Sequence, residues 1–146
     1  MRRILIFILI SFLLSPVWAR DYQSLYRGMV SDREFKAKDK TILLFWSMRC
    51  PYCRKSIRAL KNKCGELKNE GYYLYLINGG ESREKIKPFI QREGITCPVL
   101  LDYEGDLGYI YQVLGIPTFV FLYKGEEIDR TNYLNEDVLK IVYGKR

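Results

Sequence analysis

The sequence predicts an α/β fold in which helices cover both faces of a central mixed β-sheet. Two continuous apolar runs, residues 41–46 and 118–123, are typical of strands buried on both faces. Segments with helical spacing of apolar residues separate and flank these runs. The chain has 146 residues, 48% of them hydrophobic, which is enough for one compact core. We therefore expect one domain over residues 20–146.

The first 19 residues predict an export signal. A basic start and a short apolar stretch lead to a Val-x-Ala cleavage pattern that ends at Ala19. The apolar stretch is shorter than the roughly 18–20 residues that a spanning helix needs. We expect residues 1–19 to be a signal peptide, with an uncleaved N-terminal membrane anchor as the alternative. Either form predicts a periplasmic or otherwise extracytoplasmic protein.

The order of the elements follows from hydrophobic spacing and from turn and capping residues. In the first half we expect a short helix within residues 22–30, a charged turn over 31–40, the central strand 41–46, and one helix that starts at Pro51 and ends at Gly71. In the second half we expect a strand at 72–77, a helix at 82–92, a short strand at 98–101, a helix capped by Asp106 and stopped by Gly115, a hairpin of strands 118–123 and 127–130, and a last helix capped by Asn135.

A Cys-Pro-Tyr-Cys motif lies at the junction between the central strand and the next helix. Because Cys50 directly precedes the helix, unpaired backbone N–H groups and the helix dipole favour its thiolate, which makes it the predicted nucleophile. Cys53 lies on the apolar stripe of the helix, so we expect it to be less exposed and to act as the resolving thiol. An inert disulfide or a metal-binding pair is the alternative for these two residues.

These features resemble the thioredoxin superfamily, and more specifically its exported TlpA/ResA-type members. The resemblance rests on Phe45 to Cys53, on Gly115-Ile116-Pro117-Thr118, on the Lys124-Gly125-Glu126 turn and on the run from Pro98 to Asp102. It implies the thioredoxin fold and thiol–disulfide oxidoreductase activity. It also implies that Pro117 is a cis proline beside the dithiol and that the backbone of Ile116 pairs with a substrate strand. Trp46 and Tyr52 flank the site, and we expect both to contact the substrate.

Two positions depart from the thioredoxin pattern. Leu44 stands where these proteins usually carry a buried acid that moves protons to and from the second cysteine. Arg49 replaces the tryptophan that normally precedes the first cysteine. Proton transfer therefore has to come from water or from a group that the pattern does not reveal.

The other two cysteines have an open assignment. Cys64 lies on the predicted core stripe, so we expect a buried unreactive thiol, with a disulfide to Cys97 as the alternative. A zinc site made of all four cysteines is a weaker alternative, because Cys64 and Cys97 do not form a second close pair in the sequence.

Composition limits the remaining function classes. The chain contains no histidine, which excludes imidazole metal ligands, a Cys-His catalytic pair and a CxxCH haem attachment. The net charge of +7 comes without a nucleic-acid recognition motif, so we expect no nucleic-acid partner. We expect no metal and no cofactor apart from the Cys50–Cys53 disulfide itself.

The predicted function is disulfide exchange with protein substrates outside the cytoplasm. The resemblance favours a reductant of protein disulfides, for example one that yields the apocytochrome c thiols. It also implies a membrane-bound electron donor that supplies the electrons, and a monomeric protein. A protein disulfide oxidase or isomerase is one alternative. A non-enzymatic Cu(I)-binding protein is another, because a cysteine pair without histidine suits a soft ion.

Overall fold

The computed structural model describes residues 19–144 and 146. A single mixed β-sheet forms its centre, with the strand order β2-β1-β5-β4-β3-β6-β7. Strands β3, β4 and β5 are parallel, whereas β6 is antiparallel to β3 and β1 is antiparallel to β5. The elements are β1 (Asp21–Ser24), β2 (Met29–Ser31), α2 (Asp32–Lys36), β3 (Lys40–Trp46), α3 (Pro51–Ala59), α4 (Lys63–Asn69), β4 (Tyr72–Gly79), α5 (Arg83–Arg92), β5 (Val99–Asp102), α6 (Asp106–Ile110), β6 (Thr118–Tyr123), β7 (Glu126–Thr131) and α7 (Glu136–Tyr143).

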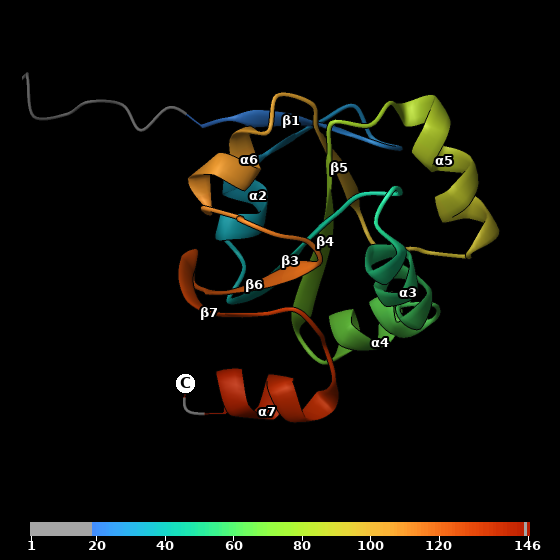
Figure 1. The fold of residues 1–146 in the computed structure, drawn as a ribbon. Helices are drawn as coiled ribbons and strands as arrows, with labels where there is room; N and C mark the ends of the chain where they lie inside the picture. The colour runs from blue at the N-terminus through green and yellow to red at the C-terminus, as the bar shows by residue number, and fades with distance from the viewer. Residues whose placement is uncertain (1–18, 145) are drawn as a thin grey trace, which may run out of the picture.

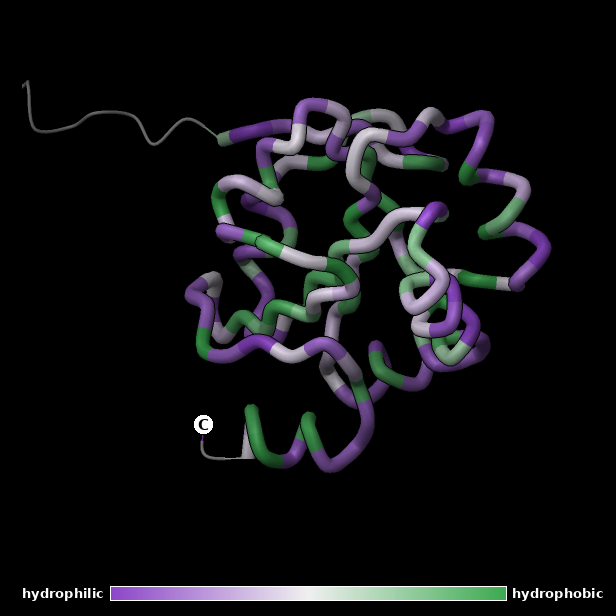
Figure 2. The backbone as a smooth tube through the Cα atoms, viewed as in Figure 1, coloured by the Kyte–Doolittle hydropathy of each residue, from purple (hydrophilic) through white to green (hydrophobic). Residues whose placement is uncertain are grey.

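Helices cover both faces of the sheet, which confirms the predicted fold class. In Figure 1, α2 and α6 lie on one side of the central strands, and α3 and α5 lie on the other. Strand β3 supplies both cores because its side chains alternate: Leu44 and Trp46 enter one cluster, and Leu43 and Phe45 enter the other. Hydrophobic residues concentrate along the central strands, whereas the outer helices alternate hydrophobic and hydrophilic positions (Figure 2).

The N-terminal part differs from the prediction. Residues 21–31 form the hairpin of β1 and β2, and the predicted helix there is wrong. Alternate residues of β1 are buried, and its pairing with β5 supplies long-range hydrogen bonds that the helical spacing of apolar residues did not reveal. The predicted charged turn contains α2, whose N-terminus is capped by Ser31 and whose Phe35 is fully buried.

The predicted long helix after Pro51 is two helices. The first helix, α3, ends at Ala59, and α4 begins at Lys63. Between them Asn62 adopts a left-handed conformation with φ 66°, which interrupts the helical hydrogen bonding. The break turns the chain, so the predicted apolar stripe does not continue along one helix axis.

Most of the second half follows the prediction. Strands β4 and β5, helix α5 and the β6–β7 hairpin lie where they were expected, and the Asn135 side chain accepts a hydrogen bond from the Val138 N–H at 2.8 Å to cap α7. The exception is α6: Asp106 is its first helical residue and not the cap, and the helix ends at Ile110 and does not continue to Gly115 as predicted. The carboxylate of Asp102 instead accepts from the N–H groups of Leu107 and Gly108, at 3.2 and 3.0 Å.

The predicted export signal, residues 1–19, lies outside the described residues except for Ala19. Within the described part of the chain, no helix is long and apolar enough to cross a membrane.

Candidate active site

The dithiol lies where β3 leads into α3. Cys50 precedes the first helical residue, Pro51, and is therefore the N-cap of α3. The backbone N–H of Cys53 donates to Cys50 Sγ at 3.1 Å, and the same sulfur lies 3.8 Å from the carbonyl oxygen of Ile116. Cys50 is partly exposed, and both cysteines are unbonded. A sulfur in this position is reachable from solvent and faces N–H groups that stabilise an anion.

The second cysteine has a different environment. Cys53 is fully buried and packs with Ile57 and Trp46 in the larger core cluster. Burial, and next the hydrogen bond to Cys50, raise the pKa of Cys53 to about 12. The two sulfurs therefore differ in exposure, and Cys53 holds its proton at neutral pH.

The raised pKa predicts how the rate of Cys53 alkylation depends on pH. A Cys50→Ser variant removes the contribution of Cys50 but keeps the burial that is the largest cause of the raised Cys53 pKa, so we expect the rate of Cys53 alkylation to keep rising with pH beyond about pH 9, because only the thiolate reacts. Mass spectrometry of the variant after timed iodoacetamide exposure measures that rate. A plateau near pH 8 to 9 would contradict the buried, protonated Cys53 seen in the structure.

Pro117 closes the other side of the site. The Ile116–Pro117 peptide bond is cis, and β6 begins at the next residue. The hydroxyl of Thr118 donates to the carbonyl oxygen of Gly115 at 2.6 Å, which closes the loop that places the Ile116 carbonyl beside Cys50. Ile116 is 43% exposed, so this loop presents both backbone and an apolar side chain next to the sulfur.

The two aromatic residues that we predicted to contact the substrate differ in their exposure to solvent. Tyr52 is 76% exposed beside the dithiol. The prediction that Trp46 contacts the substrate is wrong, because its indole is 1% exposed and packs against Phe89 with ring centroids 6.0 Å apart. Trp46 lies in the same core cluster as Cys53.

A buried carboxylate that the sequence analysis missed lies under the dithiol loop. Glu81 is 6% exposed, and its two oxygens accept from the hydroxyl of Ser47 at 3.1 Å, the N–H of Met48 at 2.8 Å and the side-chain amide of Asn78 at 2.8 Å. The guanidinium of Arg49 lies 3.8 Å from the same carboxylate. Glu81 also acts electrostatically on Cys53, where its negative charge adds to the rise in pKa.

The buried carboxylate beside the dithiol loop thus comes from Glu81 and not from position 44. Leu44 is fully buried among apolar side chains of the core, as its sequence position implied. Asn78 and Gly79 end β4, Gly80 and Glu81 follow it, and β3 and β4 are parallel neighbours. The carboxyl ends of neighbouring parallel strands meet at one sheet edge, so a polar residue just after β4 could have been assigned to the dithiol site.

This geometry predicts the effect of removing the carboxylate. We expect Glu81→Ala to lower the free energy of unfolding by about 2 to 4 kcal/mol, because it leaves buried donors of Met48 and Asn78 without an acceptor. Glu81→Gln keeps an acceptor oxygen and should stay within about 1 kcal/mol of the parent. Urea denaturation of the two variants measures the difference, and equal stabilities would contradict the network.

Comparison with known proteins assigns the chain to a family. Residues 20–140, which include the dithiol and the Pro117 loop, match the sequence model of the AhpC/TSA family. The chain belongs to the AhpC/TSA family.

Curated relatives of this AhpC/TSA family member are thiol–disulfide oxidoreductases by name. It is 30% identical over 95 residues to sporulation thiol-disulfide oxidoreductase A of Bacillus subtilis, a match that covers 63% of this chain and 58% of that protein. It is 26% identical over 96 residues to thiol-disulfide oxidoreductase ResA of Halalkalibacterium halodurans, covering 66% and 54%. The chain thus spans less than two thirds of the length of these relatives. The predicted resemblance to ResA-type proteins is confirmed.

Solved structures confirm the thioredoxin-like fold of this AhpC/TSA family member. The crystal structure of StoA from Bacillus subtilis superposes with a TM-score of 0.71 at 24% identity, covering 86% of this chain and 96% of that one. A secreted Mycobacterium tuberculosis disulfide oxidoreductase superposes with a TM-score of 0.71 at 18% identity, covering 87% and 96%.

The remaining two cysteines of this AhpC/TSA family member form a disulfide. Cys64 on α4 forms a disulfide with Cys97, which lies 33 positions later in the chain and two residues before the first residue of β5. The expectation of a buried unreactive Cys64 thiol is wrong, and the alternative pairing is correct. The break at Asn62 turns α4 and separates Cys64 from the line of the α3 stripe. Among the residues that the structure describes, no three His, Cys, Asp or Glu side chains gather as a set of metal ligands.

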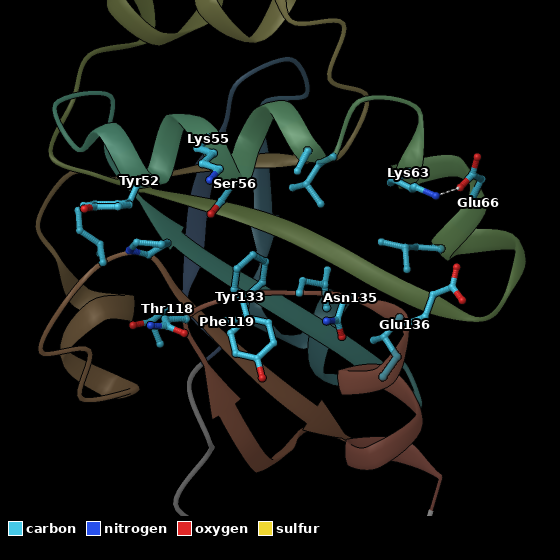
Figure 3. A pocket seen from close by; sticks show the side chains of 18 of the residues that line it. Tyr52, Lys55, Ser56, Lys63, Glu66, Thr118, Phe119, Tyr133, Asn135 and Glu136 are labelled. Atoms are coloured by element: carbon cyan, nitrogen blue, oxygen red, sulfur yellow. Dashed lines mark ion pairs between the residues drawn. The ribbon is translucent and has the colours of Figure 1, made fainter.

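A groove of about 940 Å³ opens beside the dithiol of this AhpC/TSA family member. One wall is α3, with Tyr52, Lys55 and Ser56, and the facing wall carries Thr118 and Tyr133 (Figure 3). Ile116 and Pro117 also line it, so the groove is continuous with the loop that faces Cys50. Its volume is near the upper end of the range of about 300 to 1,000 Å³ that is usual for ligand pockets.

Proposed function

We propose that this protein is an extracytoplasmic thiol–disulfide oxidoreductase that exchanges disulfides with polypeptide substrates through Cys50 and Cys53. The observation that carries the proposal is the position of Cys50. Its sulfur receives the Cys53 N–H at the start of α3 and lies 3.8 Å from the Ile116 carbonyl, next to the cis bond to Pro117. The names of the curated relatives support the same chemistry.

The reaction uses the difference between the two sulfurs. The Cys50 thiolate attacks one sulfur of a substrate disulfide, forms a mixed disulfide and releases the other substrate sulfur as a thiolate. Cys53 then loses its proton and attacks Cys50, which forms the Cys50–Cys53 disulfide and releases the second substrate thiolate. Two electrons pass from the protein to the substrate, and the reverse sequence oxidises a substrate dithiol.

Proton transfer at Cys53 has a candidate partner. The Cys53 pKa of about 12 means that the thiol needs a base as it attacks. Glu81 is a buried carboxylate with an electrostatic effect on Cys53, and it is the group that we assign to this proton, directly or through water.

Substrate contact falls to the exposed residues around the sulfur. The backbone of Ile116 pairs with an extended substrate segment, and Pro117 fixes the loop so that the segment passes Cys50. The ring of Tyr52, 76% exposed, contacts the same segment from α3. Main-chain pairing tolerates many substrate sequences, so one protein acts on different polypeptides.

The cellular role that we propose follows the ResA-type resemblance. The protein works as a monomer outside the cytoplasm, exported or anchored by residues 1–19, and reduces disulfides in proteins such as apocytochrome c to thiols. A membrane-bound electron donor returns Cys50 and Cys53 to the dithiol. In this proposal residues 20–146 form the redox domain, and no metal or separate cofactor takes part.

Trapping with a Cys53→Ala variant tests this function. Without the resolving sulfur, Cys50 stays joined to its partner, so we expect mixed disulfides that disappear on reduction with dithiothreitol. Proteomic identification of the partner then distinguishes a reductant of specific protein disulfides from a general oxidase or isomerase. The matched control is Cys50→Ser/Cys53→Ala, which has no nucleophile.

Two outcomes would contradict the proposal. One is the absence of any mixed disulfide under conditions in which a thioredoxin with the same alteration is trapped. The other is tight stoichiometric Cu(I) binding by the reduced protein without any disulfide turnover, which would instead support a copper carrier.

A further inference from the structure

The segment of the chain that carries Cys50 has charged residues of one sign. Residues 41–62, which lead into and form α3, contain five basic residues and no acidic one: Arg49, Arg54, Lys55, Arg58 and Lys61. Residues 107–125, which contain the loop on the other side of the sulfur, contain no acidic residue either. We call the residues of the α3 segment and of the Pro117 loop on either side of Cys50 the rim of the site. The rim is therefore positively charged on the α3 side and has no acidic side chain on the loop side.

Two of these cations flank the nucleophile directly. Arg49 precedes Cys50, its side chain is 86% exposed, and the carboxylate 3.8 Å from it belongs to the buried Glu81. Lys55 is exposed on the next turn of α3 and lines the groove beside Tyr52. Within the described residues, no acidic side chain forms an ion pair with Lys55. Figure 3 shows Lys55 and Tyr52 at the same end of the groove.

The other basic residues contribute less to this rim. Arg54 donates to the carbonyl oxygen of Met48 and supports the dithiol loop. Arg58 is paired with Glu93 at 3.2 Å. Three acidic residues line the groove, Glu66, Glu70 and Glu136, and Figure 3 shows Glu66 on α4 and Glu136 on α7 away from the end that carries Tyr52. The positive charge is thus concentrated where the substrate cysteine has to lie.

We propose that this site selects polypeptide substrates with acidic residues beside the reacting cysteine. This inference rests on the proposed function and adds the substrate class. Arg49 and Lys55 attract the acidic side chains while the substrate chain enters the groove between α3 and the Pro117 loop. Opposite charges across an interface mainly increase the rate of association, and added salt weakens the attraction.

Matched chromogenic peptides test the proposal. Each peptide has one cysteine that carries a 2-thiopyridyl group, and the two residues on each side of it are all Glu in one peptide and all Lys in the other. The Cys50 thiolate attacks the peptide sulfur and releases pyridine-2-thione, and Cys53 then attacks Cys50 and frees the peptide thiol. Absorbance of the released thione gives the second-order rate constant for the reduced protein.

We expect the Glu peptide to react about ten times faster than the Lys peptide in about 10 mM salt, and less than about twice as fast in about 0.5 M salt. An Arg49→Gln/Lys55→Gln variant should lose the preference at low salt. The matched control, Lys38→Gln/Lys124→Gln, makes the same change in net charge at the end of β3 opposite the dithiol, where the Lys124 N–H donates to the Asp39 carbonyl oxygen, and should keep it. Lys124 follows β6 at the sheet edge opposite the dithiol, where Tyr123 pairs with Lys40.

A neutral small disulfide, the 2-thiopyridyl derivative of mercaptoethanol, separates two kinds of failure. If the protein does not react with it, the proposed function is wrong. If it reacts with it but treats the two peptides equally, only the charge preference is wrong. The rate with this compound also corrects each variant for any change in the reactivity of Cys50.

Lipid binding is the remaining alternative for a basic face. Sedimentation with vesicles of phosphatidylcholine containing about 30% phosphatidylserine measures it. Binding to these vesicles together with equal rates for the two peptides would assign the basic face to a membrane surface and overturn the proposal. Faster reaction of the Glu peptide, lost in the Arg49→Gln/Lys55→Gln variant, would support it.

Discussion

Replacing Cys50 with serine is expected to lower the rate of disulfide exchange by at least about a thousandfold, because a hydroxyl at the start of α3 is not ionised at neutral pH and cannot form the mixed disulfide. The fold should remain intact, since Cys50 is partly exposed and a serine also accepts the Cys53 N–H as an N-cap. Reduction of the neutral 2-thiopyridyl disulfide, followed by absorbance, measures the rate.

The companion variant Cys53→Ala sharpens this result. It keeps the nucleophile and lacks the resolving sulfur, so it should react once with the neutral disulfide and then stop. The expected signature is mercaptoethanol that stays bonded to Cys50 and adds its mass to the variant in mass spectrometry, whereas the parent protein ends as the Cys50–Cys53 disulfide without added mass. Comparable turnover by Cys50→Ser and the parent protein would mean that the reacting sulfur is another cysteine.

Removing the Cys64–Cys97 disulfide should have the largest effect on stability. The two cysteines are 33 residues apart, and a crosslink that closes a loop of this length stabilises a protein by about 3 to 4 kcal/mol through the unfolded chain. We expect the Cys64→Ser/Cys97→Ser variant to lose about that much, with a fall in Tm of about 10 to 15 °C. Urea and thermal denaturation without reductant measure both.

The same variant separates stability from activity. Cys64 and Cys97 lie outside the dithiol, so the folded variant should reduce the neutral disulfide at close to the parent rate at a temperature well below its Tm. A stability within about 0.5 kcal/mol of the parent would show that the bond adds little to folding. A large loss of rate in the folded variant would instead show that this bond takes part in the redox reaction.

Much of the redox centre could be predicted because its determinants are local. The apolar run that forms β3, Pro51 at the first helical position and the spacing of Cys50 and Cys53 are features of neighbouring residues. The Asn135 cap of α7 depends on neighbouring residues in the same way. Such features specify where an element begins or ends, and the structure contains them at the predicted places.

The errors occurred where distant segments decide the outcome. Residues 22–30 have helical spacing but form a hairpin, because β1 gains hydrogen bonds by pairing with β5. Trp46 lies beside the dithiol in sequence, yet it points into the core and packs on Phe89, because alternate residues of β3 face opposite sides of the sheet.

By itself, the sequence determined the redox dithiol, its position at the start of a helix and the α/β class of the fold, since these depend on spacing within short segments. Only the tertiary structure decided that Cys64 pairs with Cys97 and that Glu81, from the turn after β4, lies under a loop 33 and 34 residues earlier. The physical reason is that a disulfide and a buried carboxylate each need a partner at a specific distance and direction. That geometry exists only once the sheet has brought separate parts of the chain together.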